Sequence, residues 1–219
     1  EDTQNTLRIE TAAGDERPYA VLCHTMCGIT GYIGQKEAAK IILEGLHALE
    51  YRGYDSAGIA VYKDGGIEVT KAVGKVAALE AKLAAAGNFA GAQVGIGHTR
   101  WATHGAPSDA NSHPHGNERV QIVHNGIIEN YAALRKMLLE KGYTFSSETD
   151  TEVAAKLIDL RYRECGDHLS ALSAVMREMV GSYAIAVLFA DTPDRLYAIK
   201  KDNPLIVGVG EGENFIASD

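Results

Sequence analysis

Several features are missing from this 219-residue sequence, and each absence excludes a class of protein. The longest apolar run extends from Tyr183 to Ala190, far short of the about 20 residues that a membrane-spanning helix needs. Lys and Arg number 21 against 29 Asp and Glu, which gives a net charge of −8. Surfaces that bind nucleic acid or anionic membranes need clustered cations. We therefore expect neither a nucleic-acid partner nor a membrane partner.

Cysteine is scarce, and the common glycine patterns of nucleotide sites are absent. The three cysteines Cys23, Cys27 and Cys165 cannot all pair, and no C-x-x-C motif occurs. A reducing compartment is the simplest expectation, and residues 1–25 lack the apolar core of a secretory signal. We therefore predict a cytoplasmic protein. No phosphate-loop or dinucleotide-binding motif is present, and we expect no cofactor.

Residues 1–26 differ in character from the rest of the chain. The first 25 residues carry five acids and two arginines without a clear period, which is typical of an extension rather than a folded element. We predict an extension over 1–26, either a propeptide or a removed leader, followed by one domain over 27–219. The sequence stops directly after a predicted strand at 214–217. We therefore expect this domain to be incomplete at its C-terminal end.

From Cys27 onward, the hydrophobic pattern predicts strands and helices in groups. Apolar and small residues at period two predict a strand at 27–33, and helical spacing predicts an amphipathic helix at 36–50. Further strands are predicted at 58–62, 67–71, 94–98, 120–125, 183–189, 195–200, 205–209 and 214–217, and helices at 76–86, 127–141, 150–165 and 169–179. This grouping favours an α+β fold of antiparallel sheets covered by helices.

Cys27 is the first candidate for chemistry because Met26 precedes it. A cysteine in a strand is more often a buried core residue. Initiator methionine, however, is efficiently removed before a small residue, and its removal would leave Cys27 with a free α-amino group beside its own thiol. An α-amino group titrates near ~7.7–8.0 and a thiol near ~8.5, so the amine can accept the thiol proton. One residue would then supply both nucleophile and base.

Four other residues fit the needs of acyl transfer from an amino acid. The Asn125 side-chain amide and the Gly126 N–H could stabilise an oxyanion, although Asn-Gly also suits a strand-to-helix turn. Arg100 could bind a substrate carboxylate, and Asp150 an ammonium group. Alternatively, Arg100 stacks on Trp101 at the surface, and Asp150 favours a helix dipole by about 0.3–1 kcal/mol.

The histidines suggest a rival hypothesis. His113-Pro114-His115 resembles the ligand spacing of a metal-dependent hydrolase, and His98, His104 and His124 lie nearby in sequence. The surrounding prolines and glycines predict a loop, which does not hold two side chains on one strand face. No carboxylate or cysteine at a fixed offset completes a ligand set. We therefore expect no metal site and keep a hydrolase based on His113 and His115 as the alternative.

Several long motifs then occur in one order along the chain: "MCGITG", "LEYRGYDSAG", "HTRWATHG", "HPH", "HNGIIEN" and "SETDTE". Together they resemble the glutaminase domains of the glucosamine-6-phosphate synthases, the glutamine–fructose-6-phosphate aminotransferases (isomerizing). The resemblance extends from Cys27 to Asp219. It implies the four-layer αββα sandwich of the N-terminal-nucleophile (class II) glutamine amidotransferases, with two antiparallel sheets face to face.

The resemblance also implies a role for each matching residue. Cys27 would be the catalytic nucleophile, with Asn125 and Gly126 as the oxyanion stabilisers. Arg100 would bind the carboxylate of glutamine and Asp150 its ammonium group. The remaining matches are the pocket-lining residues Thr103 and His104, the gating residue Trp101, and the loop residues Arg52 and His113.

The implied reaction is hydrolysis of L-glutamine to glutamate and ammonia through a Cys27 thioester. In the full-length enzymes, expected to be homo-oligomers, a separate isomerase domain uses the ammonia to convert fructose-6-phosphate to glucosamine-6-phosphate. That domain is absent from this sequence. Because an acylated α-nitrogen cannot act as a base, translation must begin at Met26 or residues 1–26 must be removed, and the bare Met26-Cys27 junction favours the first. Otherwise the chain would be a non-catalytic, glutamine-binding remnant.

Overall fold

The computed structural model describes residues 8–11, 27–87, 89–101 and 106–219. Within these ranges, no helix combines the length and the apolar character needed to cross a membrane. The strands are β1 (Arg8–Thr11), β2 (Gly28–Ile33), β3 (Ser56–Lys63), β4 (Gly66–Val73), β5 (Val94–Arg100), β6 (His115–Gly116), β7 (Val120–Ile128), β8 (Gly181–Phe189), β9 (Tyr197–Lys201), β10 (Ile206–Val209) and β11 (Asn214–Ala217). The helices are α1 (Ala38–Ala48), the 3-10 turn η1 (Glu50–Arg52), α2 (Val76–Ala86), α3 (Tyr131–Glu140), α4 (Asp150–Cys165) and α5 (His168–Glu178).

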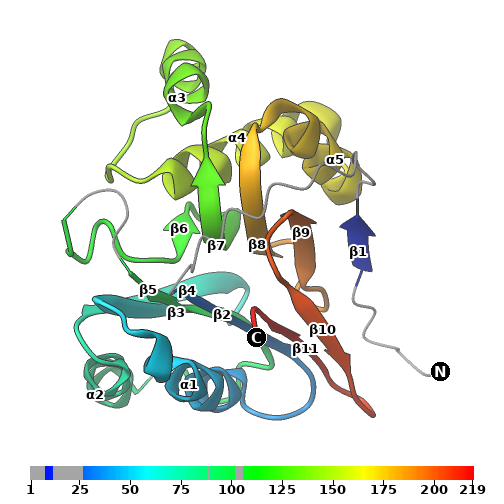
Figure 1. Cartoon of the computed structure of the whole chain (residues 1–219). Coiled ribbons are helices and arrows are strands. Elements are labelled where there is room, and N and C mark those ends of the chain that lie inside the picture. Colours follow the sequence, from blue (N-terminus) through cyan, green and yellow to red (C-terminus); the bar gives the residue numbers. More distant parts are fainter. Residues whose placement is uncertain (1–7, 12–26, 88, 102–105) are drawn as a thin grey trace.

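Two sheets lie face to face, and helices cover their outer sides (Figure 1). The five-stranded sheet has the order β1-β9-β8-β7-β6, and the six-stranded sheet has the order β10-β11-β2-β5-β3-β4. Among the described strands, every pair within the named sheets is antiparallel except β1 with β9. Helices α1 and α2 lie on the six-stranded sheet, and α3, α4 and α5 lie beyond the five-stranded one (Figure 1). The predicted four-layer α+β sandwich is confirmed.

The layer between the two sheets explains why the strands alternate as they do. Ile29 and Ile33 of β2 are fully buried there, together with Ile96 of β5 and Val123 of β7. Full burial of one such side chain stabilises the fold by about 1.5–3 kcal/mol. Tyr32 points to the other face of β2, into the cluster beneath α1. The predicted period of two in this strand therefore holds, and it places Cys27 on the inter-sheet face.

Local turn and cap chemistry sets the bounds of two of these elements. Asp64 and Gly65 both have positive φ, 50° and 85°, as a two-residue hairpin between β3 and β4 requires. The side chain of Thr149 accepts a hydrogen bond from the N–H of Glu152 at 3.2 Å, which starts α4 at its predicted residue. The Glu152 carboxylate does not accept from the Thr149 N–H in return, because that N–H donates to Ser147 Oγ. It binds the N–H groups of Ser146 and Ser147 instead.

Three elements differ from the sequence prediction. The helix predicted at 127–141 is α3 and begins only at Tyr131, because β7 continues to Ile128 in register with β8. Part of the predicted loop around His115 forms the short strand β6 against β7. Part of the predicted extension forms β1 beside β9. Because strand pairing is made by the backbone, residues 8–11 can form a strand without a side-chain period that would predict it. Their pairing does not test whether residues 1–26 are an extension that is removed.

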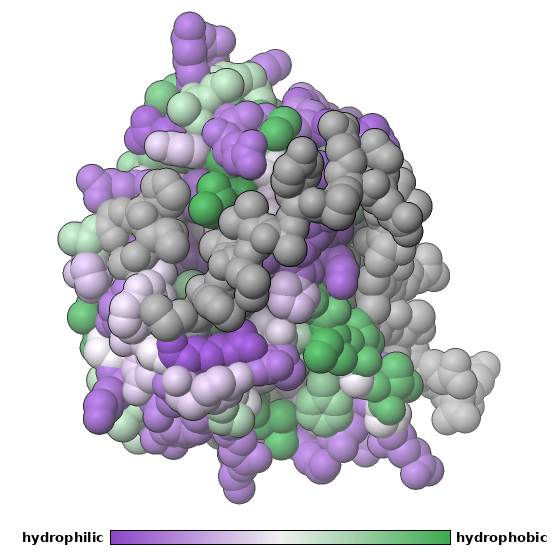
Figure 2. All heavy atoms as spheres, in the orientation of Figure 1, coloured by the Kyte–Doolittle hydropathy of each residue, from purple (hydrophilic) through white to green (hydrophobic). Residues whose placement is uncertain are grey.

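One edge of the six-stranded sheet is apolar and exposed. Strand β10 lies at this edge, and Ile206 and Val209 are 54% and 82% exposed. Figure 2 shows the apolar surface gathered where β10 and β11 lie. Unpaired edges of this kind are templates for further strand pairing.

Candidate active site

The polar residues singled out in the sequence gather at one end of the inter-sheet layer. Cys27 continues the inward face of β2, and Arg100 continues that of β5 beyond Ile96. Gly28 pairs with Thr99, which sets Cys27 beside the end of β5. Because side chains alternate with a period of two, the inward-facing side of each strand continues to this end of the layer. The layer is therefore apolar in its centre and polar at this end.

The sulfur of Cys27 is held at the end of β5. The backbone N–H of Trp101 donates a hydrogen bond to Cys27 Sγ at 3.2 Å, and the Trp101 carbonyl lies 3.6 Å from the same sulfur. Cys27 itself is half-buried. A backbone N–H aimed at this atom stabilises negative charge on sulfur. The carbonyl in turn accepts from the thiol, so the pair of contacts fixes the position of the sulfur, and its partial exposure leaves it reachable from solvent.

Asn125 reaches Cys27 from the opposite sheet. Its side chain is buried, with 3% exposure. Asn125 Nδ2 donates to the Cys27 carbonyl oxygen at 3.2 Å, and Oδ1 lies 2.9 Å from His98 Nε2. The backbone oxygen of Asn125 accepts from Asn203 Nδ2 at 3.1 Å. An amide donor is therefore fixed within one hydrogen bond of the candidate nucleophile, and a second N–H of the same nitrogen is left for another acceptor.

Gly126 occupies a position that only glycine fits. Its φ is 122°, and an added Cβ would come within 2.1 Å of the Ser182 carbonyl oxygen and 2.3 Å of Asn203 Nδ2. Asn125 and Gly126 lie inside β7, because pairing continues to Ile128 opposite Gly181. The alternative of a strand-to-helix turn at Asn-Gly is therefore wrong.

One buried cation and one buried anion lie near these residues. Arg100 is 4% exposed, and its Nη1 lies 3.8 Å from Asp55 Oδ1. The backbone oxygen of Arg100 also accepts from the N–H of Asp55 at 2.7 Å. This burial excludes the alternative of a stacked surface pair with Trp101. Asp150 begins α4, and its Oδ2 accepts from the N–H of Ile128 at 2.9 Å, which ties the helix to β7.

The segment before α4 is held by Glu152. Burial alone would raise the pKa of this carboxyl group, but hydrogen bonds from Ser146 and Ser147 outweigh it and lower the pKa to about 2. Ser147 also donates through its hydroxyl at 2.7 Å. The Glu152 carboxylate therefore stays ionised and fixes the loop that leads to Asp150.

Four histidines form a buried cluster behind Asn125, with members His98, His113, His115 and His124. Burial lowers the pKa of His98 and of His115 to about 3, and it lowers the pKa of His113 well below 6.5. His113 Nδ1 accepts from the N–H of His124 at 3.2 Å, and His115 Nε2 lies 3.2 Å from Thr149 Oγ1. These two ring nitrogens, His113 Nδ1 and His115 Nε2, are engaged within the protein. Across the described ranges, no three His, Cys, Asp or Glu side chains are placed to hold a metal ion, so nothing in this geometry favours the metal-dependent alternative.

The remaining predicted site residues lie at different distances from Cys27. An added Cβ on Gly53 would lie 2.7 Å from the Trp101 ring, so the turn after η1 packs on that ring. In η1, Arg52 Nη2 pairs with Asp219 Oδ2 at 2.5 Å. His113 belongs to the buried cluster. Thr103 and His104 lie outside the described residues.

Some residues of this site carried no signal in the sequence. Ser218 Oγ accepts from the N–H of Ile29 at 3.0 Å, and the N–H of Ser218 donates to the Ile29 carbonyl at 3.1 Å. Both contacts fasten the strand that carries Cys27. Asn203 and Asp55 were likewise not singled out as site residues. The contact of His98 with Asn125 depends on two strands from different sheets, so the sequence did not indicate it.

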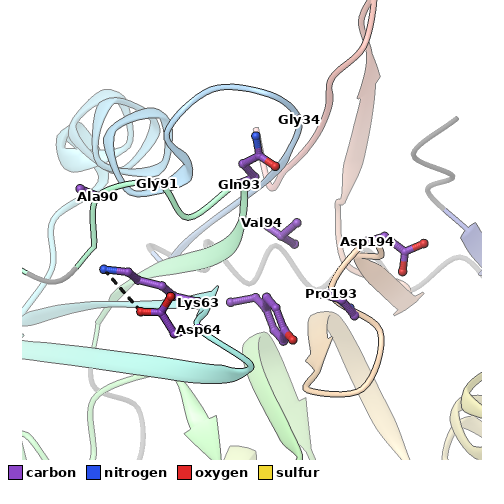
Figure 3. Close-up of a pocket in the computed structure, with 10 residues that line it drawn as sticks. Gly34, Lys63, Asp64, Ala90, Gly91, Gln93, Val94, Pro193 and Asp194 are labelled. Carbon is purple, nitrogen blue, oxygen red and sulfur yellow. Dashed lines mark ion pairs between the residues drawn. The ribbon is translucent and has the colours of Figure 1, made fainter. Parts of the chain in front are cut away.

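A cavity of about 450 Å³ lies at the opposite end of the sandwich (Figure 3). Gly34, which follows β2, and Val94, which begins β5, contribute to its wall. Lys63 and Asp64 face each other across 4.0 Å on its rim (Figure 3). None of the candidate residues lines this cavity, so it is separate from the site at Cys27.

A family model and several curated proteins match this chain in sequence. The family model described as a glutamine amidotransferase domain matches residues 98–219. The glutamine–fructose-6-phosphate aminotransferase (isomerizing) of Clostridium perfringens is 58% identical over 196 residues, which cover 89% of this chain and 32% of that protein. The protein of the same name from Pyrococcus horikoshii is 52% identical over 198 residues, with the same two shares. The chain thus spans about a third of the length of these curated relatives.

Solved structures give the same result for the fold. The glutamine phosphoribosylpyrophosphate amidotransferase from B. subtilis, complexed with ADP and GMP, matches with a TM-score of 0.71 and 25% identity, over 88% of this chain and 42% of that one. A glutamine aminotransferase class-II domain protein from Silicibacter pomeroyi has the same fold, with a TM-score of 0.54 over 88% of both chains. Together with the match over residues 98–219, these likenesses show that the chain belongs to the glutamine amidotransferase domain family.

Proposed function

We propose that Cys27, once residues 1–26 are absent, hydrolyses the side-chain amide of L-glutamine to glutamate and ammonia. The observation that carries the proposal is the hydrogen bond from Asn125 Nδ2 to the Cys27 carbonyl oxygen. This bond joins an amide donor in the five-stranded sheet to Cys27 at the end of the six-stranded sheet. Among the described residues at this end, only Cys27 carries a thiol. The contact of Cys27 Sγ with the Trp101 N–H supports the same reading.

In the proposed reaction, the α-amino group of Cys27 takes the thiol proton, and the thiolate attacks the amide carbon of glutamine. The oxyanion is stabilised by Asn125 Nδ2 and the Gly126 N–H. The C–N bond then breaks, the α-ammonium group returns its proton to nitrogen, and ammonia leaves behind a glutamyl thioester. Water adds to the thioester carbon, the thiol departs with a proton, and glutamate is released. Loss of one oxyanion donor typically slows such turnover by about 10²–10³.

Charged groups of the site would select an amino acid. Arg100 would bind the α-carboxylate of glutamine, and its burial makes such a pair strong because little water competes. Asp150, at the start of α4 and tied to β7, would bind the α-ammonium group. By the family resemblance, Thr103 and His104 would also line the glutamine pocket.

Two further matches would control access. Trp101 is 43% exposed, and its ring, packed on Gly53, would gate the exit of ammonia. Arg52, on the turn next to Gly53, would belong to a loop that closes over bound glutamine. His113 would act from the buried cluster rather than on the substrate.

In the whole protein, the ammonia would convert fructose-6-phosphate to glucosamine-6-phosphate on a separate isomerase domain. This proposal rests on the names of the relatives, of whose length the chain spans 32%. We also propose, from the family resemblance, that the complete protein is a homo-oligomer, and, from the composition of the sequence, that it is cytoplasmic.

The test compares Cys27→Ala with wild-type protein that begins at Cys27. We expect glutamate release from glutamine in the wild type, no measurable release in Cys27→Ala, and unchanged release after treatment with a chelator. Cys165→Ala is the matched control, because Cys165 is an exposed thiol at the end of α4. Loss of activity on chelation, restored by zinc, would instead support the hydrolase based on His113 and His115. Glutamine binding without turnover would support the non-catalytic alternative.

A further inference from the structure

We propose that His98 is a positioning residue that sets the direction of the Asn125 side-chain amide. An Asn amide has an acceptor end and a donor end of nearly equal size, and only the donor end can stabilise an oxyanion. Something must therefore hold Nδ2, and not Oδ1, toward Cys27. The inference rests on the proposed function, because it concerns how the oxyanion donor of that reaction is oriented.

The two contacts of the Asn125 side chain determine its orientation. The acceptor on one side is the Cys27 carbonyl, 3.2 Å from Nδ2. A carbonyl oxygen cannot donate, so the atom facing it must be the nitrogen. Oδ1 then faces His98 Nε2 at 2.9 Å, and an oxygen there requires a donor. His98 must therefore carry its proton on Nε2.

The surroundings of His98 keep its ring neutral and fixed in place. The side chain is 1% exposed, and burial lowers its pKa to about 3, so the ring holds a single proton at neutral pH. The His98 ring stacks on His113, with centroids 4.0 Å apart and planes 13° apart. His113 is in turn fixed by the N–H of His124 at 3.2 Å. The ring of His98 thus has neither the charge nor the freedom to present a different atom to Asn125.

The approach of His113 to the sheet requires a glycine in β3. An added Cβ on Gly58 would lie 2.0 Å from the His113 carbonyl oxygen. Gly58 is paired with His98 across β3 and β5. The stacked histidine pair is therefore built into the packing of the six-stranded sheet.

Two substitutions separate the hydrogen bond from the packing. His98→Phe keeps a ring against His113 and removes the donor, whereas His98→Gln keeps a side-chain N–H donor. In protein that begins at Cys27, we expect His98→Phe to lower kcat for glutamate release about tenfold to a hundredfold, with little change in KM. We expect His98→Gln to recover most of this loss. Unchanged kcat in His98→Phe would contradict the inference.

A double-substitution cycle distinguishes positioning from a general effect on the fold. If His98 acts only through the Asn125 amide, His98→Phe should change kcat by less than about twofold in an Asn125→Ala background. If His98→Phe lowers kcat by the full amount in the Asn125→Ala background as well, the inference is overturned. A general structural defect would lower kcat in both backgrounds.

A readout without turnover keeps this inference separate from the proposed function. Nitrogen-15 NMR of His98 should show the proton on Nε2 at neutral pH, and a crystal structure of His98→Phe should show the Asn125 amide turned away from the Cys27 carbonyl. A proton on Nδ1, or an unmoved amide, would contradict the positioning role alone. Wild-type protein that begins at Cys27 and releases no glutamate would contradict the proposed function.

Discussion

The backbone N–H of Trp101 donates a hydrogen bond to Cys27 Sγ across 3.2 Å, although the two residues are 74 positions apart. The donor belongs to the main chain, so its position depends on how the end of β5 is held. The Trp101 ring lies against Gly53, the residue after η1. The turn carrying Arg52 therefore supports the segment that contacts the candidate nucleophile.

Gly53→Ala should disturb this contact. The residue has a φ of 80°, and its added Cβ would lie 2.7 Å from the Trp101 ring. The ring must shift and move the Trp101 N–H from the sulfur, so we expect glutamate release to slow several-fold. Gly74→Ala is the matched control, with a φ of 97° and nothing within 4 Å of its added Cβ. Equal rates for the two variants would contradict the role of the ring.

Gly126→Ala should lower stability far more than a positive φ alone explains. An alanine held at positive φ costs about 1 kcal/mol, and Gly65→Ala, with open space around its added Cβ, should show that cost. At Gly126 the Cβ would also meet the Ser182 carbonyl at 2.1 Å. We expect a loss in the free energy of unfolding of about 3 kcal/mol or more, measured by urea denaturation. Similar losses for both variants would show that β7 relaxes around the clash.

Arg100→Lys should weaken glutamine binding although it keeps the charge. A lysine cannot reproduce the two parallel hydrogen bonds that a guanidinium gives to a carboxylate. We expect KM for glutamine to rise about tenfold or more, with a smaller change in kcat. The control is Arg195→Lys, on a side chain that is 41% exposed. An unchanged KM in Arg100→Lys would assign Arg100 to the pair with Asp55 rather than to substrate.

Stability should fall as the pH drops below about 6.5, the ordinary pKa of histidine. Burial lowers the pKa of His98 and of His115 to about 3 in the folded protein, so only the unfolded chain takes up these protons between pH 6.5 and 3. Stability is then complete above 6.5 and is lost toward 3. The lowered pKa of Glu152, about 2, adds a separate loss between about 4.5 and 2.

Urea denaturation at several pH values measures this dependence. His115→Phe should reduce the slope between pH 6 and 4 by up to one proton, about 1.4 kcal/mol per pH unit. A free energy of unfolding that does not change from pH 7 to 5 would contradict the neutral, buried histidines.

Sequence patterns predicted the elements whose causes are local. Strand β2 follows from its alternating residues, and α4 begins at Asp150 because Thr149 caps it. The start of α3 was placed four residues early, because the length of β7 depends on pairing with β8 rather than on its own residues. The pattern of residues around Ile127 does not show that β7 continues to Ile128.

The sequence pointed to several residues that the structure brings together at the candidate site, but not to the contacts between them. Cys27, Asn125 and Gly126 stood out because reactive or permissive residues interrupted apolar strands. The contact of His98 with Asn125 and that of Ser218 with Ile29 join residues 27 and 189 positions apart. Such contacts depend on how two strands meet in space, which no local pattern contains.

The central claim is that a free α-amino group on Cys27 serves as the base for its own thiol. Intact mass measurement of active protein, before and after labelling with an electrophilic glutamine analogue, tests it most directly. We predict that glutamine-consuming material begins at Cys27 and gains one label there, with loss of activity in proportion. Active material that still carries a peptide bond before Cys27, or a label on another residue, would contradict the account.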